Sequence, residues 1–159
     1  MARKGAAMAL YSKILAALDS GDTRLAVARH ALAIAHDNQA EVLFAHIVDA
    51  GELIDARTDI VNYLAPCKQA IEDELADELA AAAHDERIPA VDILVRGGIV
   101  VDALSMVAED YKPDLVVCGA RGLHGIKLAI LGSVSTYLVR HMPCDVLVVR
   151  PEALRNEEA

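Results

Sequence analysis

The sequence has 159 residues, which is the length of a single domain, and its 55% hydrophobic content and mean hydropathy of +0.32 exclude a disordered chain. Aromatic residues make up only 3%, so the core has to be aliphatic, and the stacking surfaces that bind single-stranded nucleic acid are nearly absent. With 24 acidic residues against 15 basic ones, the net charge of −9 disfavours generic DNA or RNA binding. The chain has no apolar run of the ~18–20 residues that cross a membrane, and its three widely spaced cysteines favour a reduced, cytoplasmic protein.

The first part of the chain alternates between strand-like and helix-like patterns. The apolar run 12–18 predicts a buried strand, and the polar residues 19–23 that follow it suit a turn and a helix N-cap. Apolar residues then recur at helical spacing between residues 25 and 35. The near-continuous apolar run 41–48 indicates a second strand that is covered on both faces.

The rest of the chain continues this alternation after a less regular segment. Residues 49–65 are too apolar for a free loop and are expected to fold over another part of the molecule. A long helix is predicted from about Pro66 to about Arg87. The later predicted elements are a strand at 91–96, a turn at Gly97 and Gly98, a helix around 103–108, a strand at 115–118, a loop at 119–131, a helix from Gly132 to about His141 and a strand from Asp145 to Arg150.

Regular alternation of strands and helices predicts an α/β fold in which a parallel sheet carries helices on both faces. In such sheets the ligand crevice lies at the carboxyl ends of the strands. If the first and fourth strands are neighbours, Asp19 and Gly119 meet at that crevice. The predicted organisation is a disordered extension at 1–9, with Met8 as an alternative start to Met1, one domain at 10–151 and a polar tail at 152–159.

Glycines punctuate the stretch between the fourth strand and the last helix. Gly119, Gly122 and the pair Gly132-Ser133 form the pattern G-x2-G-x9-G-S. Glycine lets backbone N–H groups approach a phosphate with no Cβ in the way, and the N-terminus of a helix favours an anion. The pattern therefore points to phosphate binding.

The same loop is basic in an otherwise acidic chain. Residues 120–131 contain Arg121, His124 and Lys127 but no acidic residue. This charge suits the phosphates of a nucleotide, and it equally fits a glycine-rich turn with solvated basic residues. Other nucleotide patterns are missing, because the sequence has neither a GxxxxGK[ST] P-loop nor a GxGxxG fingerprint after the first strand.

The pattern G-x2-G-x9-G-S resembles the ATP-binding signature of the universal stress protein family. The strand that leads to Asp19, the run 43–49 and the end of the chain at 143–149 are also similar to segments of that family, so the resemblance covers about residues 11–151. It implies a Rossmann-like fold of the adenine nucleotide alpha hydrolase type, with a five-stranded parallel sheet in the order 3-2-1-4-5. One departure is Val100, at a position where the family often has Pro.

Family members with this loop bind ATP, and the resemblance implies that the matching positions of this chain contact an adenine nucleotide. Asp19 would face the adenine and ribose region, and the backbone of Ile47 would meet adenine. ATP is the expected cofactor, with ADP or AMP as alternatives, and an ion of Mg²⁺ or Mn²⁺ is implied by the phosphates and not by any metal-site pattern. The expected contacts, with Arg121 of the basic loop included, are Ala17, Leu18, Asp19, Ile47, Cys118, Gly119, Arg121, Gly122, Gly132, Ser133, Val134 and Ser135.

No catalytic residue and no protein metal ligand are predicted. The motif supplies no second carboxylate beside Asp19 for a metal ion or water, so we expect a nucleotide-dependent stress-response or signalling module with little turnover. The alternative is a slow ATPase or phosphotransferase that uses the same pocket. The family is usually homodimeric, and the last strand, from Asp145 to Arg150, would be an apolar sheet edge that a second copy covers.

Overall fold

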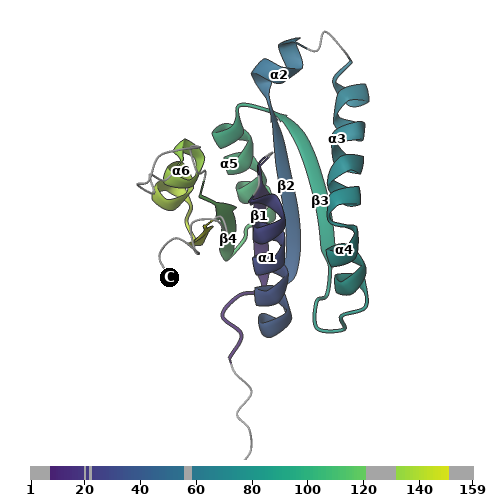
Figure 1. The fold of residues 1–159 in the computed structure, drawn as a ribbon. Helices are drawn as coiled ribbons and strands as arrows, with labels where there is room; N and C mark the ends of the chain where they lie inside the picture. The colour runs from purple at the N-terminus through teal and green to yellow at the C-terminus, as the bar shows by residue number, and fades with distance from the viewer. Residues whose placement is uncertain (1–7, 20, 22, 56–58, 121–131, 151–159) are drawn as a thin grey trace, which may run out of the picture.

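One parallel sheet forms the centre of the molecule in the computed structural model, which describes residues 8–19, 21, 23–55, 59–120 and 132–150. Its strands are β1 (Lys13–Leu18), β2 (Glu41–Asp49), β3 (Val91–Gly98), β4 (Leu115–Gly119) and β5 (Asp145–Val149). They lie in the order β3-β2-β1-β4-β5, and every neighbouring pair is parallel (Figure 1). The predicted 3-2-1-4-5 topology is therefore confirmed.

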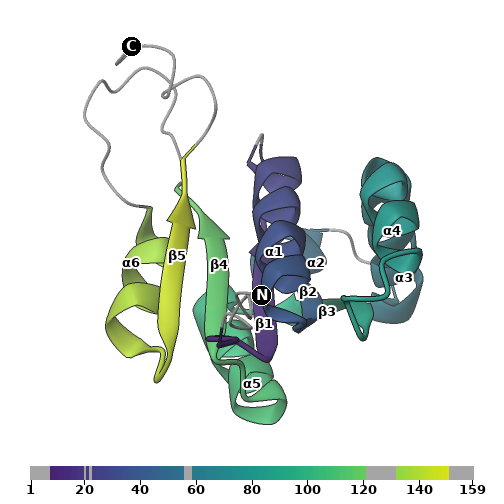
Figure 2. The same ribbon diagram turned by 90° about the horizontal axis from the view of Figure 1, so that it is seen from below.

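Helices connect the strands and cover both faces of the sheet. They are α1 (Arg24–Asn38), α2 (Ala50–Asp55), α3 (Ile60–Glu74), α4 (Ala76–Ala83), α5 (Val100–Tyr111) and α6 (Ser133–His141). Figure 2 shows α1, α3 and α4 on one face of the sheet and α5 and α6 on the other. Within the residues that the structure describes, no helix combines the length and the apolar character needed to cross a membrane.

Side chains of the central strand enter two separate hydrophobic cores. Ile14, Ala16 and Leu18 pack in the core under α1, α3 and α4. Leu15 and Ala17 pack in the core under α5 and α6. Because successive residues of a strand point to opposite faces, a strand that is covered on both faces reads as one continuous apolar run.

The core under α1 is built from aliphatic side chains and small residues. Ala28, Ala31 and Ala35 on α1 are fully buried, and so is Phe44, which is the single phenylalanine of the chain. A helix face made of alanines lets the helix backbone lie close to the sheet, and this close packing compensates for the scarcity of large aromatic side chains.

The helical segment between β2 and β3 differs from the prediction. The prediction of one helix from about Pro66 to about Arg87 is wrong. The helix α3 begins before Pro66 and contains it, and α4 follows as a separate helix. The Asp59 carboxylate accepts a hydrogen bond from the Val61 N–H (3.2 Å) and so caps the earlier start. The interruption falls at Leu75, a fully buried residue whose φ of −97° and ψ of 13° leave the helical region.

The turn predicted at Gly97 and Gly98 is also wrong, because both glycines pair with β2 as the end of β3. Pairing between β1 and β2 ends at Leu18 and His46, whereas pairing between β2 and β3 continues to Asp49 and Gly98. The part of β2 beyond His46 therefore forms a ledge past the end of β1. The helix α2, which belongs to the segment expected to fold over the molecule, follows this ledge and contacts β2 and β3.

A carboxylate holds the other end of β1 in place. One oxygen of Asp114 accepts hydrogen bonds from the Ser12 N–H (2.8 Å) and the Ser12 hydroxyl (2.7 Å), and the other accepts one from the Lys13 N–H (3.0 Å). Partial burial alone would raise the pKa of the Asp114 carboxyl, but these hydrogen bonds outweigh it and hold the pKa below its usual value. The charged form of Asp114 therefore stabilises the fold.

Replacing this carboxylate gives a test with a defined pH dependence. A carboxyl whose pKa is lowered on folding adds stability above its unfolded pKa, and the contribution is lost as the pH falls through the folded-state pKa. Asp114→Asn should lower the free energy of unfolding by about 1–2 kcal/mol at neutral pH. Urea unfolding at a series of pH values should show the difference from wild type shrinking in acid. Asp110→Asn, an exposed carboxylate on α5, is the control, and a difference that persists undiminished at about pH 2 would contradict the assignment.

Candidate functional site

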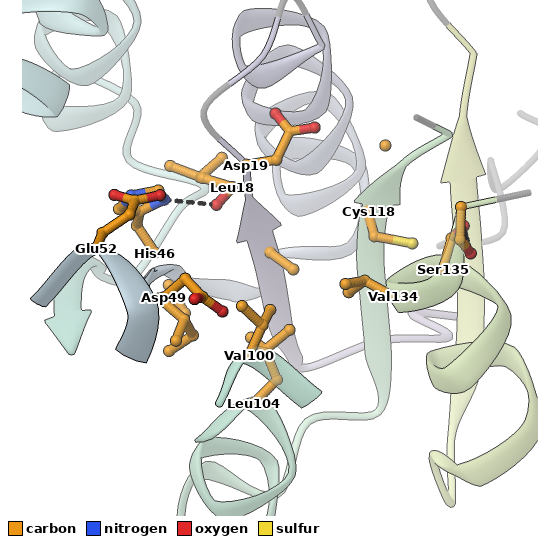
Figure 3. A pocket seen from close by; sticks show the side chains of 15 residues that line it. Leu18, Asp19, His46, Asp49, Glu52, Val100, Leu104, Cys118, Val134 and Ser135 are labelled. Atoms are coloured by element: carbon orange, nitrogen blue, oxygen red, sulfur yellow. Dashed lines mark hydrogen bonds between the residues drawn. The ribbon is translucent and has the colours of Figure 1, made fainter. Parts of the chain in front are cut away.

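A pocket lies at the carboxyl ends of the central strands, as the winding of the sheet predicts (Figure 3). The strands β1, β2 and β4 contribute its floor, and α2, α5 and α6 contribute its walls. Most of the sequence-predicted contact residues line it: Ala17, Leu18, Asp19, Ile47, Cys118, Gly119, Gly132, Val134 and Ser135.

The remaining predicted contacts do not line the pocket within the described part of the chain. Ser133 is exposed at the start of α6 and is not a lining residue. Arg121 and Gly122 lie outside the described residues, as does the rest of the basic loop to residue 131. The expectation that these residues bind phosphate stays a prediction.

Asp19 is the best-fixed polar residue of the pocket. One carboxylate oxygen accepts a hydrogen bond from the Thr23 hydroxyl (3.0 Å), and the other accepts one from the Gly21 N–H (3.0 Å). The Asp19 carbonyl accepts a further bond from Arg24 Nε (2.7 Å), and Arg24 itself forms an ion pair with Glu74 (2.6 Å) on α3. The acidic turn after β1 is therefore held through both its side chain and its backbone.

His46, near the end of β2, also lines the pocket. Its Nδ1 lies 2.8 Å from the Leu18 carbonyl oxygen (Figure 3). A carbonyl can only accept, so Nδ1 carries the proton and the orientation of the ring is fixed. The bond connects the end of β1 to β2 and holds the ring at the pocket wall.

Further lining residues were missed by the sequence reasoning, and they close the end of the pocket that Figure 3 shows opposite Val134 and Ser135. Asp49 and Glu52 give this end an acidic character, and Val100 and Leu104 of α5 form an apolar base. The missed residues are Ala45, His46, Asp49, Glu52, Val100 and Leu104. The strand residues and Leu104 lie in elements that the sequence pattern predicted, whereas Glu52 had no signal, since the six residues of α2 are too few to show helical periodicity.

The opposite end of the pocket combines a glycine with a helix N-terminus. Gly119 ends β4, and Gly132 is the N-cap of α6 with an extended backbone (φ −61°, ψ 163°). The first N–H groups of a helix have no acceptor within the helix, and the helix dipole favours an anion there. The Ser135 hydroxyl, expected as a donor to ligand, instead donates to the Gly132 carbonyl (3.0 Å) and is nearly fully buried.

Cys118 lies in the pocket floor between these two ends. Burial, and secondarily the negative charge of Asp19, raise the pKa of its thiol to about 11. The thiol therefore stays protonated at neutral pH and is a poor nucleophile, which agrees with an inert structural cysteine. No group of three or more His, Cys, Asp or Glu residues within the described ranges is arranged to hold a metal ion.

Gly119 is required by a close approach to α1. A Cβ at this position would lie 2.9 Å from Thr23 Cβ and would also overlap the Thr23 hydroxyl oxygen. Contacts this short do not occur between real side chains, so either the strand or Thr23 has to move. The first glycine of the signature is thus explained by packing against Thr23, independently of any ligand.

This close approach makes Gly119→Ala a test of the site geometry. The added methyl group should lower the free energy of unfolding by about 1–3 kcal/mol, because it overlaps a buried neighbour. Chemical denaturation followed by circular dichroism measures the effect. Gly21→Ala is the matched control, since its new methyl group would meet only the Asp19 carboxylate at 3.5 Å or more, an ordinary contact. Equal stability of the two variants would show that Thr23 does not constrain Gly119.

Comparison with known proteins identifies one family. Its sequence model, that of the universal stress protein family, matches residues 10–150. A putative universal stress protein of Staphylococcus saprophyticus is 29% identical over 151 residues, and the alignment covers 94% of this chain and 90% of the relative. Among solved structures, the universal stress protein UspA from Lactobacillus plantarum is 27% identical with a TM-score of 0.60, covering 88% of this chain and 98% of that one. A crystal structure of a universal stress protein in complex with cAMP is 28% identical with a TM-score of 0.59, covering 90% of this chain and 99% of that one.

Proposed function

The chain belongs to the universal stress protein family, and we propose that it binds ATP or another adenine nucleotide in the pocket at the carboxyl end of its sheet. One observation carries the proposal. A single pocket brings the fixed carboxylate of Asp19 together with Gly119 and the N-terminus of α6, although these elements are far apart in the sequence. This combination offers polar groups for a nucleoside at one end and an anion site at the other.

The nucleoside would lie at the end formed by β1, β2 and α5. Ala17, Ile47 and Leu104 supply aliphatic surface there, which suits a purine held without ring stacking. The ledge of β2 beyond His46 supplies backbone groups that can bond the edge of adenine. Asp19 would accept hydrogen bonds from adenine or ribose, since it lines the pocket between the two ends (Figure 3).

The phosphates would lie between Gly119 and the first turn of α6. Gly119 and Gly132 line this end of the pocket, and the first N–H groups of α6 are donors for a phosphate. The proposal extends this site to Arg121, Gly122 and Ser133 on the sequence pattern alone. An accompanying Mg²⁺ or Mn²⁺ would be held by the phosphate oxygens, because the described residues offer no ligand cluster of their own.

The sequence and the structural comparison support different adenine nucleotides. The loop pattern favours ATP, whereas the similar structure solved with cAMP supports a nucleotide with one phosphate. We propose that occupancy of the pocket regulates contacts with other proteins in the cytoplasm, consistent with cysteines that are all free. No catalytic residue is assigned.

Nucleotide binding is tested by heating the purified protein, separating the released compounds by chromatography, and titrating stripped protein with ATP, AMP and cAMP. We expect an adenine nucleotide to bind with a Kd below the millimolar range. Gly122→Val should abolish binding without changing the circular dichroism spectrum, because a Cβ would block the approach of phosphate. Gly125→Val, in the same loop but outside the signature, is the matched control. Absence of any binding at millimolar nucleotide would refute the proposed function.

We also propose that two copies pair through β5. This strand lies at the edge of the sheet, and its side chains are mostly half-buried, so its outer edge can receive a strand from a second copy. Multi-angle light scattering should give twice the mass of one chain. A mass equal to one chain at micromolar concentration would rule this arrangement out.

A further inference from the structure

Thr23 occupies the N-cap position of α1, but its hydroxyl does not cap the helix. The polar run 19–23 predicts an N-cap, and the structure places Thr23 at the N-cap position of α1. A capping residue normally has extended backbone angles and bonds an N–H of the first turn. Thr23 instead has helical angles (φ −86°, ψ −11°), and within the described part of the chain its side chain makes no capping bond.

The hydroxyl of Thr23 is directed to the pocket instead. Thr23 is only 4% exposed, so its hydroxyl needs a partner inside the protein. That partner is the Asp19 carboxylate, at 3.0 Å, and a carboxylate only accepts hydrogen bonds, so Thr23 is the donor. The Thr23 hydroxyl thus bonds a pocket residue and not the first turn of α1. Departures from local preferences such as helix capping are expected mainly at functional sites.

The backbone around Asp19 is already fixed by other contacts, which isolates the role of Thr23. Arg24 holds the Asp19 carbonyl, and Glu74 holds Arg24. The remaining freedom is rotation of the carboxylate, and the Gly21 N–H fixes one of its oxygens. The Thr23 hydroxyl fixes the other oxygen and so sets the plane of the carboxylate.

Thr23 also touches the opposite side of the pocket. It occupies the space in which a Cβ at Gly119 would lie, so the last residue of β4 packs directly against the start of α1. Thr23 therefore contacts both the residue that follows β1 and the last residue of β4.

We propose that Thr23 is a positioning residue for nucleotide binding, acting through the Asp19 carboxylate. This inference rests on the proposed function, since it assigns Asp19 a role in holding the nucleoside. An Asp19 carboxylate that is already oriented loses no rotational freedom when the ligand binds, and this raises the affinity. Thr23 itself does not touch the ligand.

The test compares Thr23→Val, which keeps the shape and removes the hydroxyl, with Thr23→Ser, which keeps the hydroxyl. Calorimetric titration with Mg²⁺ and ATP should give about tenfold weaker binding for Thr23→Val and near-normal binding for Thr23→Ser. In an Asp19→Ala background, Thr23→Val should not weaken nucleotide binding further, because the carboxylate through which Thr23 acts is absent. Normal binding by Thr23→Val, or an equal loss in both backgrounds, would overturn the inference.

A second measurement needs no nucleotide. The amide proton of Gly21 bonds the Asp19 carboxylate, so its signal in a ¹H–¹⁵N spectrum of ligand-free protein reports the carboxylate orientation. The signal should move in Thr23→Val toward its position in Asp19→Ala, and it should stay in place in Thr23→Ser. If wild type fails to bind ATP, the proposed function fails for that ligand, and an unmoved Gly21 signal in Thr23→Val would separately overturn the positioning role.

Discussion

The double pairing of β1 is the constraint on which the site depends. β1 bonds β2 along one edge and β4 along the other, with Ala17 opposite Ala45 on one side and opposite Cys118 on the other. Because all three strands run parallel, their carboxyl ends reach the same edge of the sheet. Asp19 and Gly119, separated by most of the chain, become neighbours through this register alone, and the pocket opens between the helices that follow these strands.

The rigidity of this edge comes from bonds between the turns, in addition to the sheet itself. His46 fastens β2 to the last residue of β1, and Arg24 with Glu74 fastens the turn after β1 to α3. Thr23 fills the space between that turn and β4. Asp19 and His46 are thus held in place without a ligand, which would lower the entropic cost of the proposed binding.

Strands and helices with a regular spacing of apolar residues could be predicted from the sequence. Features that depend on contacts between distant elements could not. Mostly apolar strand segments alternate with helical patterns, and the glycine signature is local, so the α/β class and a ligand site at the carboxyl ends of the strands were predictable from the residues. The strand order and the list of pocket residues came from the resemblance to the universal stress protein family. Pro66 indicated the start of a helix, but α3 is capped earlier, at Asp59, and contains Pro66. Glu52 lies on a helix too short to show helical periodicity, and the bond between the Thr23 hydroxyl and Asp19 depends on the conformation of the turn, which no residue pattern specifies.

The unequal lengths of β1 and β2 have a consequence for what the pocket can recognise. Beyond His46, β2 is paired with β3 but has passed the end of β1, so the side of it that faced β1 becomes a sheet edge inside the molecule. The peptide groups on such an edge require hydrogen-bond partners. A flat molecule with a donor beside an acceptor can complete the pairing in the way that another strand would. If the proposed nucleotide binds here, the backbone of β2 would recognise the donors and acceptors on the edge of its ring, and side-chain substitutions along β2 that preserve the backbone would leave this recognition unchanged.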